Sequence, residues 1–341
     1  MSNTASEATA PRRYVGGPIR GGTTLVEMMI VIACFSVVAL ATYEVVMRTN
    51  LDSAHLNAWN QLTQWRQNVI HQTDAELTQS RYIYQNDALG TAYLNKLEAD
   101  VNFPILATSL LPLIDPTGTF HQDSVVTRTG NVVLYVKEAA PFVGDADGTT
   151  RRVDIYYMGC YYLSPGGQPV GGKSTSLRLI KWQSREFADY NQVMAISQPV
   201  ARTAFVVNLY TNRGIRYLWL PHNTPATAFY AIDEFGDIAG APDAAYTIQK
   251  NTAESMISDI GSGYASIAWN RGNDFWVPDI VPKFALVSVS GDGFPHGFEV
   301  QIIGPSSARQ ILIRIVLAYF VSLDRSFFSA ESSTIVAMHE F

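Results

Sequence analysis

Residues Gly167–Ser174 (GQPVGGKS) have the spacing of a phosphate-binding P-loop, in which backbone amides and a lysine hold the phosphates of a nucleotide. Such a loop binds phosphates only when it opens onto a helix whose N-terminus faces them. The segment that follows here, TSLRLIKW, alternates Leu177 and Leu179 with other residues, which predicts a strand. We therefore interpret the glycine-rich segment as the tip of a hairpin and not as a nucleotide site.

Three aspartates, Asp145, Asp147 and Asp154, surround a glycine in the segment GDADGTTRRVD, as carboxylates do in calcium loops. An EF-hand needs a third ligand before the glycine and a glutamate near its end, and the segment has neither. A solvated turn accounts for these residues. We expect no cofactor, with calcium at these three aspartates as the alternative hypothesis.

Other residues that commonly do chemistry show no catalytic pattern. The six histidines lack the paired spacing of a zinc site, and no G-x-S-x-G elbow is present. The two cysteines, Cys34 and Cys160, have no histidine beside them in the sequence. The sequence offers no positive evidence for catalysis, and we predict that the protein is not an enzyme.

A carboxylate within an apolar segment is the most unusual placement in the chain. Between Thr23 and Met47 the only charged side chains are Glu27 and Glu44. A helix of roughly 20 residues spans the ~30 Å core of a bilayer, so this segment is long enough to cross it. Basic residues precede it and none follows until Arg48, which predicts a single pass with a cytoplasmic N-terminus and an exported body. An acidic residue at mid-membrane costs ~2.5 to 3.5 kcal/mol, so Glu27 needs a partner.

Three interpretations of this segment compete. In the first it is a secretory signal, cut after the small-x-small tripeptide Ala39–Ala41 so that the mature chain begins at Thr42. In the second it is an anchor that is never cut. Either one would leave a secreted or membrane-anchored enzyme or binding protein that uses the segment only as an export signal. The third interpretation starts from the position of Glu27.

Gly22 is followed by Thr-Thr-Leu-Val-Glu, which places Glu27 at the fifth position after the glycine, and an apolar run follows. This segment resembles the prepilin motif of the type IV pilin and pseudopilin family. The resemblance implies that prepilin peptidase cuts after Gly22 and that the new amine of Thr23 is N-methylated. It also implies that Glu27 attracts the N-terminal amine of a neighbouring subunit and that Leu25 and Val26 take part in assembly. Thr23 departs from the family's usual Phe, and the leader is longer than most.

Further implications of the resemblance concern partners and subtype. The implied partners are prepilin peptidase, other pilins or pseudopilins bound through the N-terminal helix, and an inner-membrane assembly platform. The large body and the closing segment 328–341 (FSAESSTIVAMHEF) are most similar to J-type minor pseudopilins of type II secretion and to W-type minor pilins. Glu27 argues against the K-type tip pseudopilin, which lacks this carboxylate.

A long helix must carry these residues. No Gly or Pro interrupts the chain from Thr23 to Asp87, and the pattern predicts one helix of some 55 to 60 residues. Beyond the membrane segment, apolar residues recur three or four apart, and we expect Leu62, Trp65 and Val69 to pack on a sheet. The stripe consists of Leu51, Ala54, Ala58, Leu62, Trp65, Val69 and Ile70.

The rest of the chain indicates short strands joined by turns, which favours antiparallel pairing. We expect a surface excursion over 221–245 and a short helix at 251–260 (NTAESMISDI). The segments with the alternation or composition of strands are 131–138, 151–163, 176–184, 203–210, 215–220, 283–290, 296–303 and 309–321.

The predicted fold class is therefore α+β, with a long N-terminal helix packed on a mostly antiparallel sheet. The expected organisation is a cytoplasmic leader over 1–22 that is removed, a transmembrane and polymerisation helix over 23–48, its extracytoplasmic continuation over 49–86, and a β-rich body over 87–341. The net charge of the whole chain is -6. Because the leader is basic, the body is more acidic still, so we do not expect nucleic acid as a partner.

Overall fold

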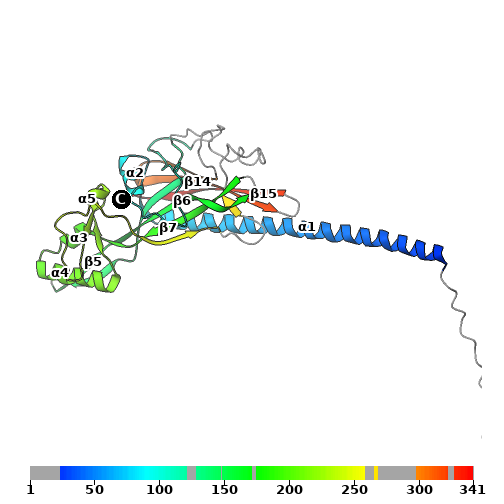
Figure 1. Ribbon diagram of the computed structural model, residues 1–341. Coiled ribbons are helices and arrows are strands. Elements are labelled where there is room, and N and C mark those ends of the chain that lie inside the picture. Colours follow the sequence, from blue (N-terminus) through cyan, green and yellow to red (C-terminus); the bar gives the residue numbers. More distant parts are fainter. Residues whose placement is uncertain are drawn as a thin grey trace, which may run out of the picture. The chain divides into compact units, whose positions relative to one another are not determined.

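The computed structural model describes residues 24–120, 128–146, 148–170, 174–257, 265–267, 297–321 and 326–340. The chain forms two compact units, Met1–Ser53 and Ala54–Phe341. Helix α1, Leu25–Thr78, is 54 residues long; it begins in the first unit and ends in the second (Figure 1). The predicted long helix and β-rich body are confirmed, and the fold class is α+β.

Within the second unit, one stripe of α1 is buried against the sheet. The predicted packing of Leu62, Trp65 and Val69 is confirmed, and the stripe continues to Thr73 and Leu77. These residues follow each other at intervals of three or four, so they lie on one face of the helix. The sheet covers this face, which makes α1 part of the core of the second unit.

An ion-pair cluster ties the same end of α1 to the sheet. The Glu76 carboxylate accepts hydrogen bonds from Nζ of Lys137 at 3.0 Å and of Lys181 at 3.2 Å, and from the hydroxyl of Tyr157 at 3.2 Å. Burial by itself would raise the pKa of Glu76, but the hydrogen bond from Lys137 and the charge of Lys181 lower this pKa overall. The cluster therefore favours the ionised carboxylate and fixes the helix against two strands.

Helix α1 ends at Thr78, earlier than the predicted end at residue 86. The Ser80 hydroxyl donates to the Leu77 carbonyl at 2.6 Å, and the chain then enters strand β1, Ser80–Ile83. This strand pairs antiparallel with β3, Val132–Glu138. The residues of β1 lack a helix breaker, so the end of the helix is set by strand pairing and by burial of Ile83, which local sequence does not reveal.

The body after β1 alternates short helices with strands, most of which join one sheet (Figure 1). Among the strands that the structure describes, pairing is antiparallel except for β8 with β9 and β13 with β2, while β4 and β5 form a separate hairpin. The remaining elements are α2 Ala88–Leu94, β2 Ile114–Asp115, β4 Phe142–Ala146, β5 Thr149–Val153, β6 Ile155–Val170, β7 Ser174–Ser184, β8 Phe187–Asp189, α3 Tyr190–Met194, α4 Pro199–Asn208, η1 Leu209–Arg213, β9 Tyr217–Trp219, α5 Pro225–Ala228, β10 Phe229–Ala231, β11 Lys250–Ser255, β12 Ala265–Ile267, β13 Phe298–Ile303, η3 Ser306–Ala308, β14 Arg309–Val321 and β15 Ser326–Met338.

The sheet buries side chains on both faces, and strand β3 shows why. Val133 and Tyr135 belong to the cluster around α1, whereas Val132, Leu134 and Val136 belong to a second cluster on the other face. Alternate residues of a strand point to opposite faces, so the near-continuous apolar run of β3 matches a strand covered on both sides. The second face is free of α1.

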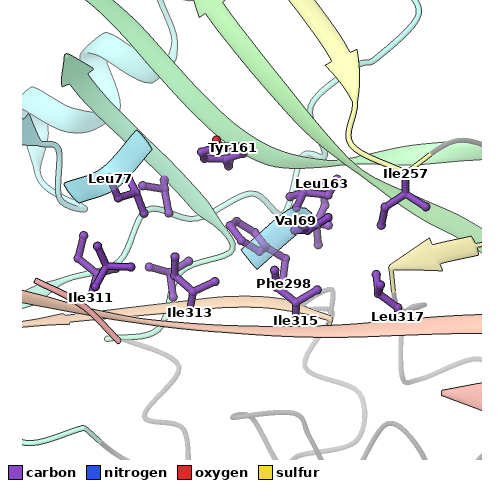
Figure 2. Close-up of a cluster of buried hydrophobic side chains, with 14 of the residues drawn as sticks. Val69, Leu77, Tyr161, Leu163, Ile257, Phe298, Ile311, Ile313, Ile315 and Leu317 are labelled. Carbon is purple, nitrogen blue, oxygen red and sulfur yellow. The ribbon is translucent and has the colours of Figure 1, made fainter. Parts of the chain in front are cut away.

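Side chains from two strands of the sheet, β6 and β14, pack against α1 in the first cluster. Figure 2 shows Val69 and Leu77 of α1 between Tyr161 and Leu163 of β6 and the side chains of β14. In β14 every second residue faces this cluster, which gives the strand its pattern of isoleucines. These residues are Ile311, Ile313, Ile315 and Leu317.

Two predicted elements are wrong. Residues 203–210 form the end of helix α4 and the start of the π-helix η1, because Phe205, Val206 and Leu209 are buried on one side and Pro199 begins the helix. Residues 251–255 belong to strand β11, which pairs with β7, and do not form a helix.

The expected surface excursion over 221–245 is partly buried, since Phe229 is inaccessible to solvent. The predicted strand at 283–290 lies outside the described residues.

Candidate assembly site at the N-terminus of helix α1

Thr24 and Glu27 form a reciprocal cap at the first turn of α1. The Thr24 amide donates to Oε2 of Glu27 at 2.9 Å, and the Glu27 amide donates to Oγ1 of Thr24 at 3.3 Å. This is the capping box of a helix N-terminus, in which two backbone amides without helical partners are satisfied by side chains. A negative side chain in the first turn also interacts favourably with the helix dipole.

The capping box gives Glu27 a partner inside its own chain. The family resemblance implies only an intermolecular partner, although the sequence also has the capping signal Thr-x-x-Glu directly before an apolar run. Both residues of the box follow Gly22 in the chain, so a cut after Gly22 would leave the box intact. One carboxylate oxygen of Glu27, Oε2, accepts the hydrogen bond from the Thr24 amide, and the negative charge of Glu27 lies at the N-terminal end of the helix.

The helix that follows exposes apolar side chains all round. From Leu25 to Met47, the large apolar residues are between 46% and 79% exposed. An 18-residue window of α1 has a mean hydropathy of 2.4 and no buried residue, so the helix is long and apolar enough to cross a membrane. Apolar surface on this scale indicates a membrane or a protein partner.

Polar groups within this apolar segment are satisfied by the helix itself. The hydroxyls of Ser36, Thr42 and Thr49 each donate to the carbonyl four residues earlier, at 2.8 Å. Glu44 and Arg48 form an ion pair at 2.6 Å one turn apart. Such internal pairing lowers the free-energy cost of placing these groups at or near hydrocarbon.

The other residues of the predicted assembly site are only partly placed. Leu25 and Val26 occupy the first two helical positions and are 79% and 62% exposed. Gly22 and Thr23 lie outside the described residues, so cleavage and methylation at this bond stay predictions. The structure places Glu27 in the first turn of the helix, beside Thr24.

The predicted calcium ligands have other partners where they are described. Asp145 lies in hairpin β4–β5 and accepts from the Thr150 hydroxyl at 3.2 Å. Asp154 accepts from Arg152 at 3.3 Å and from Gln192 at 2.8 Å. Among the residues that the structure describes, no three His, Cys, Asp or Glu side chains are grouped as metal ligands. Asp147 lies outside them, so the expectation of no cofactor stays a prediction and calcium at these aspartates stays the alternative hypothesis.

The glycine-rich segment 167–174 belongs to a β-hairpin, as its sequence indicates. Strands β6 and β7 pair antiparallel, with Val170 opposite Ser174. A strand therefore occupies the place where a P-loop requires a helix N-terminus. Residues 171–173 lie outside the described part of the chain.

The two thiols differ in exposure and lie far apart in the sequence. Cys34 is exposed on α1, whereas Cys160 is buried in β6. Burial raises the pKa of the Cys160 thiol, so the reactive thiolate is disfavoured. Cys160 is a packing residue of the second cluster.

Comparison with known proteins matches only the N-terminal segment. The family model of the prokaryotic N-terminal methylation motif matches residues 20–43, which include Gly22, Thr23 and Glu27. No curated protein and no solved structure matches the chain. The match supports a type IV pilin-like substrate of prepilin peptidase, and the apolar helix fits a membrane-anchored protein. The similarity to J-type or W-type subunits has no support beyond the sequence resemblance.

Proposed function

We propose that the protein is a structural minor pilin or pseudopilin of a type IV pilus or a type II secretion system. In this proposal prepilin peptidase cuts after Gly22, Thr23 becomes the methylated N-terminus, and α1 anchors the subunit in the inner membrane before assembly. The observation that carries the proposal is the match of the methylation motif to residues 20–43, over a helix whose apolar surface the chain leaves exposed.

The body supports a place at the tip or in the initiating complex. Between the end of α1 and Met338, the residues that the structure describes form one large sheet, the separate hairpin β4–β5 and short helices. A bulky body is easier to accommodate at the end of a filament than along its shaft, where every subunit has neighbours on all sides. The function proposed for the body is therefore lateral contact with other subunits, and no turnover of a substrate is required.

The mature N-terminus tests the proposal against the export-signal alternative. We expect mass spectrometry of the protein from membranes to find a chain that begins at Thr23 with one added methyl group. A chain that begins at Thr42 would remove the first part of α1 and contradict the proposal. An uncut chain would favour a plain membrane anchor.

The capping box allows the charge of Glu27 to be tested separately from its cap. Glu27→Gln keeps an acceptor for the Thr24 amide and removes the charge, whereas Thr24→Ala removes the cap from Oγ1 and keeps the charge. If Glu27 pairs with the amine of a neighbouring subunit, Glu27→Gln and Glu27→Ala abolish incorporation into filaments while Thr24→Ala retains it. Normal incorporation of Glu27→Gln together with loss in Thr24→Ala would assign Glu27 to capping alone. All three variants should still be cut after Gly22.

A further inference from the structure

A cleft of about 300 Å³ opens on the second face of the sheet, the face that α1 does not cover. Strands β1, β3, β6 and β9 and the turn before α5 contribute its walls. The volume is at the lower end of the range for small-molecule sites, ~300 to 1,000 Å³. All of its walls belong to the second unit, and the proposed assembly function of α1 does not use it.

Aromatic side chains form one part of the wall. Tyr82 and Tyr84 meet edge to face with ring centroids 5.0 Å apart, and Tyr156 and Trp219 do so at 5.4 Å. The Trp219 indole donates to the hydroxyl of Tyr93 at 3.1 Å, so its orientation is fixed from behind. Tyr84 and Trp219 are almost fully buried, so the half-buried rings of Tyr82 and Tyr156 give a ligand the accessible part of this rigid apolar surface.

Charged side chains form the other part, and their charges are already paired. Glu138 accepts from Nε of Arg81 at 2.9 Å and from Arg152 at 3.2 Å. Asp154 accepts from Arg152 and from Gln192. Ion pairing therefore neutralises both carboxylates within the protein and holds their oxygens in fixed positions.

A strained turn supplies a further polar group at the rim. His222 has a φ of 65°, which non-glycine residues seldom adopt, and its ring meets Tyr82 edge to face at 5.5 Å. Backbone strain of this kind collects at ligand-binding positions, because a fold keeps it only where the surroundings impose it. The turn holds the His222 ring beside the aromatic wall.

These features exclude several classes of ligand. Arg81 and Arg152 already donate to Glu138 and Asp154, so a phosphate or another anion would have to compete with these carboxylates for the two guanidinium groups. A cation such as a quaternary ammonium group would need carboxylates that are not already paired with arginines. A lipid chain would leave three charged residues, Arg81, Glu138 and Asp154, without water. The remaining class is a neutral ligand with one apolar face and many hydroxyls.

We propose that this cleft binds a neutral saccharide, with room for about one pyranose ring of a glycan. The C–H groups of the sugar ring pack on the aromatic wall, and neighbouring hydroxyls hydrogen-bond to Glu138, Asp154 and His222. No bond is made or broken. Burial raises the pKa of Tyr156 to about 12, with the charges of Asp189, Asp154 and Glu138 adding to the effect, so its hydroxyl remains a neutral donor.

The experiment measures binding of neutral sugars to the full chain in a polyoxyethylene detergent, which contains neither sugar nor ammonium groups. The probes are glucose, galactose, mannose, N-acetylglucosamine and their short oligomers. Saturation-transfer NMR and tryptophan fluorescence detect their binding. Tetramethylammonium and inorganic phosphate serve as probes of the excluded classes. We expect at least one neutral sugar to bind and neither ion to do so.

Two variants locate the binding site, and two matched variants control for them. Glu138→Gln should weaken binding about tenfold, because hydrogen bonds to a charged carboxylate are replaced by weaker ones to a neutral amide oxygen. Tyr156→Phe keeps the ring and should weaken it about threefold or more, by the loss of one neutral hydrogen bond. Glu234→Gln, on the exposed surface, and Tyr190→Phe, in another cluster, should leave binding unchanged.

Several outcomes would overturn the inference. They are failure of every sugar to bind, binding of tetramethylammonium or phosphate in place of sugar, and sugar binding that Glu138→Gln and Tyr156→Phe leave intact. Circular dichroism shows whether each variant folds. If Glu138→Gln fails to fold, Tyr156→Phe decides the question, because it changes one hydroxyl and no ion pair.

Discussion

The first part of α1, Leu25–Met47, and its last part, Ala58–Leu77, belong to one helix but differ in which of their apolar side chains are exposed. Apolar residues of the first part are exposed on every side. In the last part a single stripe is apolar and buried, and the sheet of the same chain covers it. Sequence pattern separates the two, since an all-round apolar helix differs from an amphipathic one.

The difference concerns where the stabilising contacts come from. The last part of α1 is held by contacts that one chain supplies, so its residues contribute to the stability of the body. The first part needs lipid or other subunits to cover it, so its residues contribute to membrane insertion and assembly. Three of the predictions below compare a residue of the exposed part with one of the buried body, and one follows the pH dependence of Glu76.

The largest expected difference is between two leucines of α1. Leu77→Ala should lower the free energy of unfolding of the body by about 2 to 5 kcal/mol, because Leu77 is fully buried and its removal leaves a cavity. Leu40→Ala, at a position that is 72% exposed, should leave it unchanged. Urea unfolding of the full chain in detergent measures both. Equal losses would show that the two parts of the helix are not distinct.

A smaller difference is expected between two glutamates of α1. Glu76→Gln should destabilise the body by about 2 kcal/mol, since Lys137 and Lys181 lose a charged acceptor in a half-buried site. Glu44→Gln breaks an exposed pair with Arg48 and should cost less than about 0.5 kcal/mol. The same unfolding measurement applies, and a larger effect at Glu44 would reverse the ranking.

The pH dependence of stability sharpens the role of Glu76. Its pKa in the folded chain is below the ordinary value of 4.5, so the unfolded chain binds the proton more readily. The contribution of Glu76 is therefore complete above 4.5 and is lost as the pH falls through the lower, folded pKa. Wild type should lose more stability than Glu76→Gln over this range. Identical pH profiles would mean that Glu76 does not titrate with folding.

The smallest effect is expected at the buried thiol. In detergent, a maleimide should leave Cys160 unlabelled until the body unfolds, because the thiol is inaccessible and its pKa is raised. Cys34 lies on the part of α1 that detergent covers and the body does not, and an apolar maleimide that enters the micelle should label it in the folded chain. Peptide mapping after labelling distinguishes them. Labelling of Cys160 in native protein would indicate that the second cluster opens.

Local sequence predicted the long helix and most of the strands because their patterns extend over many residues. It failed where tertiary pairing decides. Residues 251–255 contain Asn, Thr and Ser, which have weak preferences, and pairing with the edge of β7 makes them a strand. At 203–210 the prediction relied on β-branched residues and overlooked Pro199, whose position at the start of a helix was a usable signal.

The capping box and the cleft also differ in how far the sequence alone could predict them. The capping box at Thr24 and Glu27 spans four residues and was readable in the sequence. The cleft combines residues from the segments 81–84, 136–138, 154–156 and 219–222. The pairing of β1 with β3, β3 with β6, β6 with β8 and β8 with β9 brings these segments together. No spacing rule links segments so far apart in the chain.

The buried stripe of α1 and the Glu76 cluster also determine how the protein responds to a pulling force. A pull along the axis of the helix loads the contacts of Leu62, Trp65, Val69 and Leu77 together with the ion pairs to Lys137 and Lys181. These contacts lie side by side along the direction of the force, so they must slide at the same time and cannot be opened one by one. The junction between helix and sheet is thus built to resist tension.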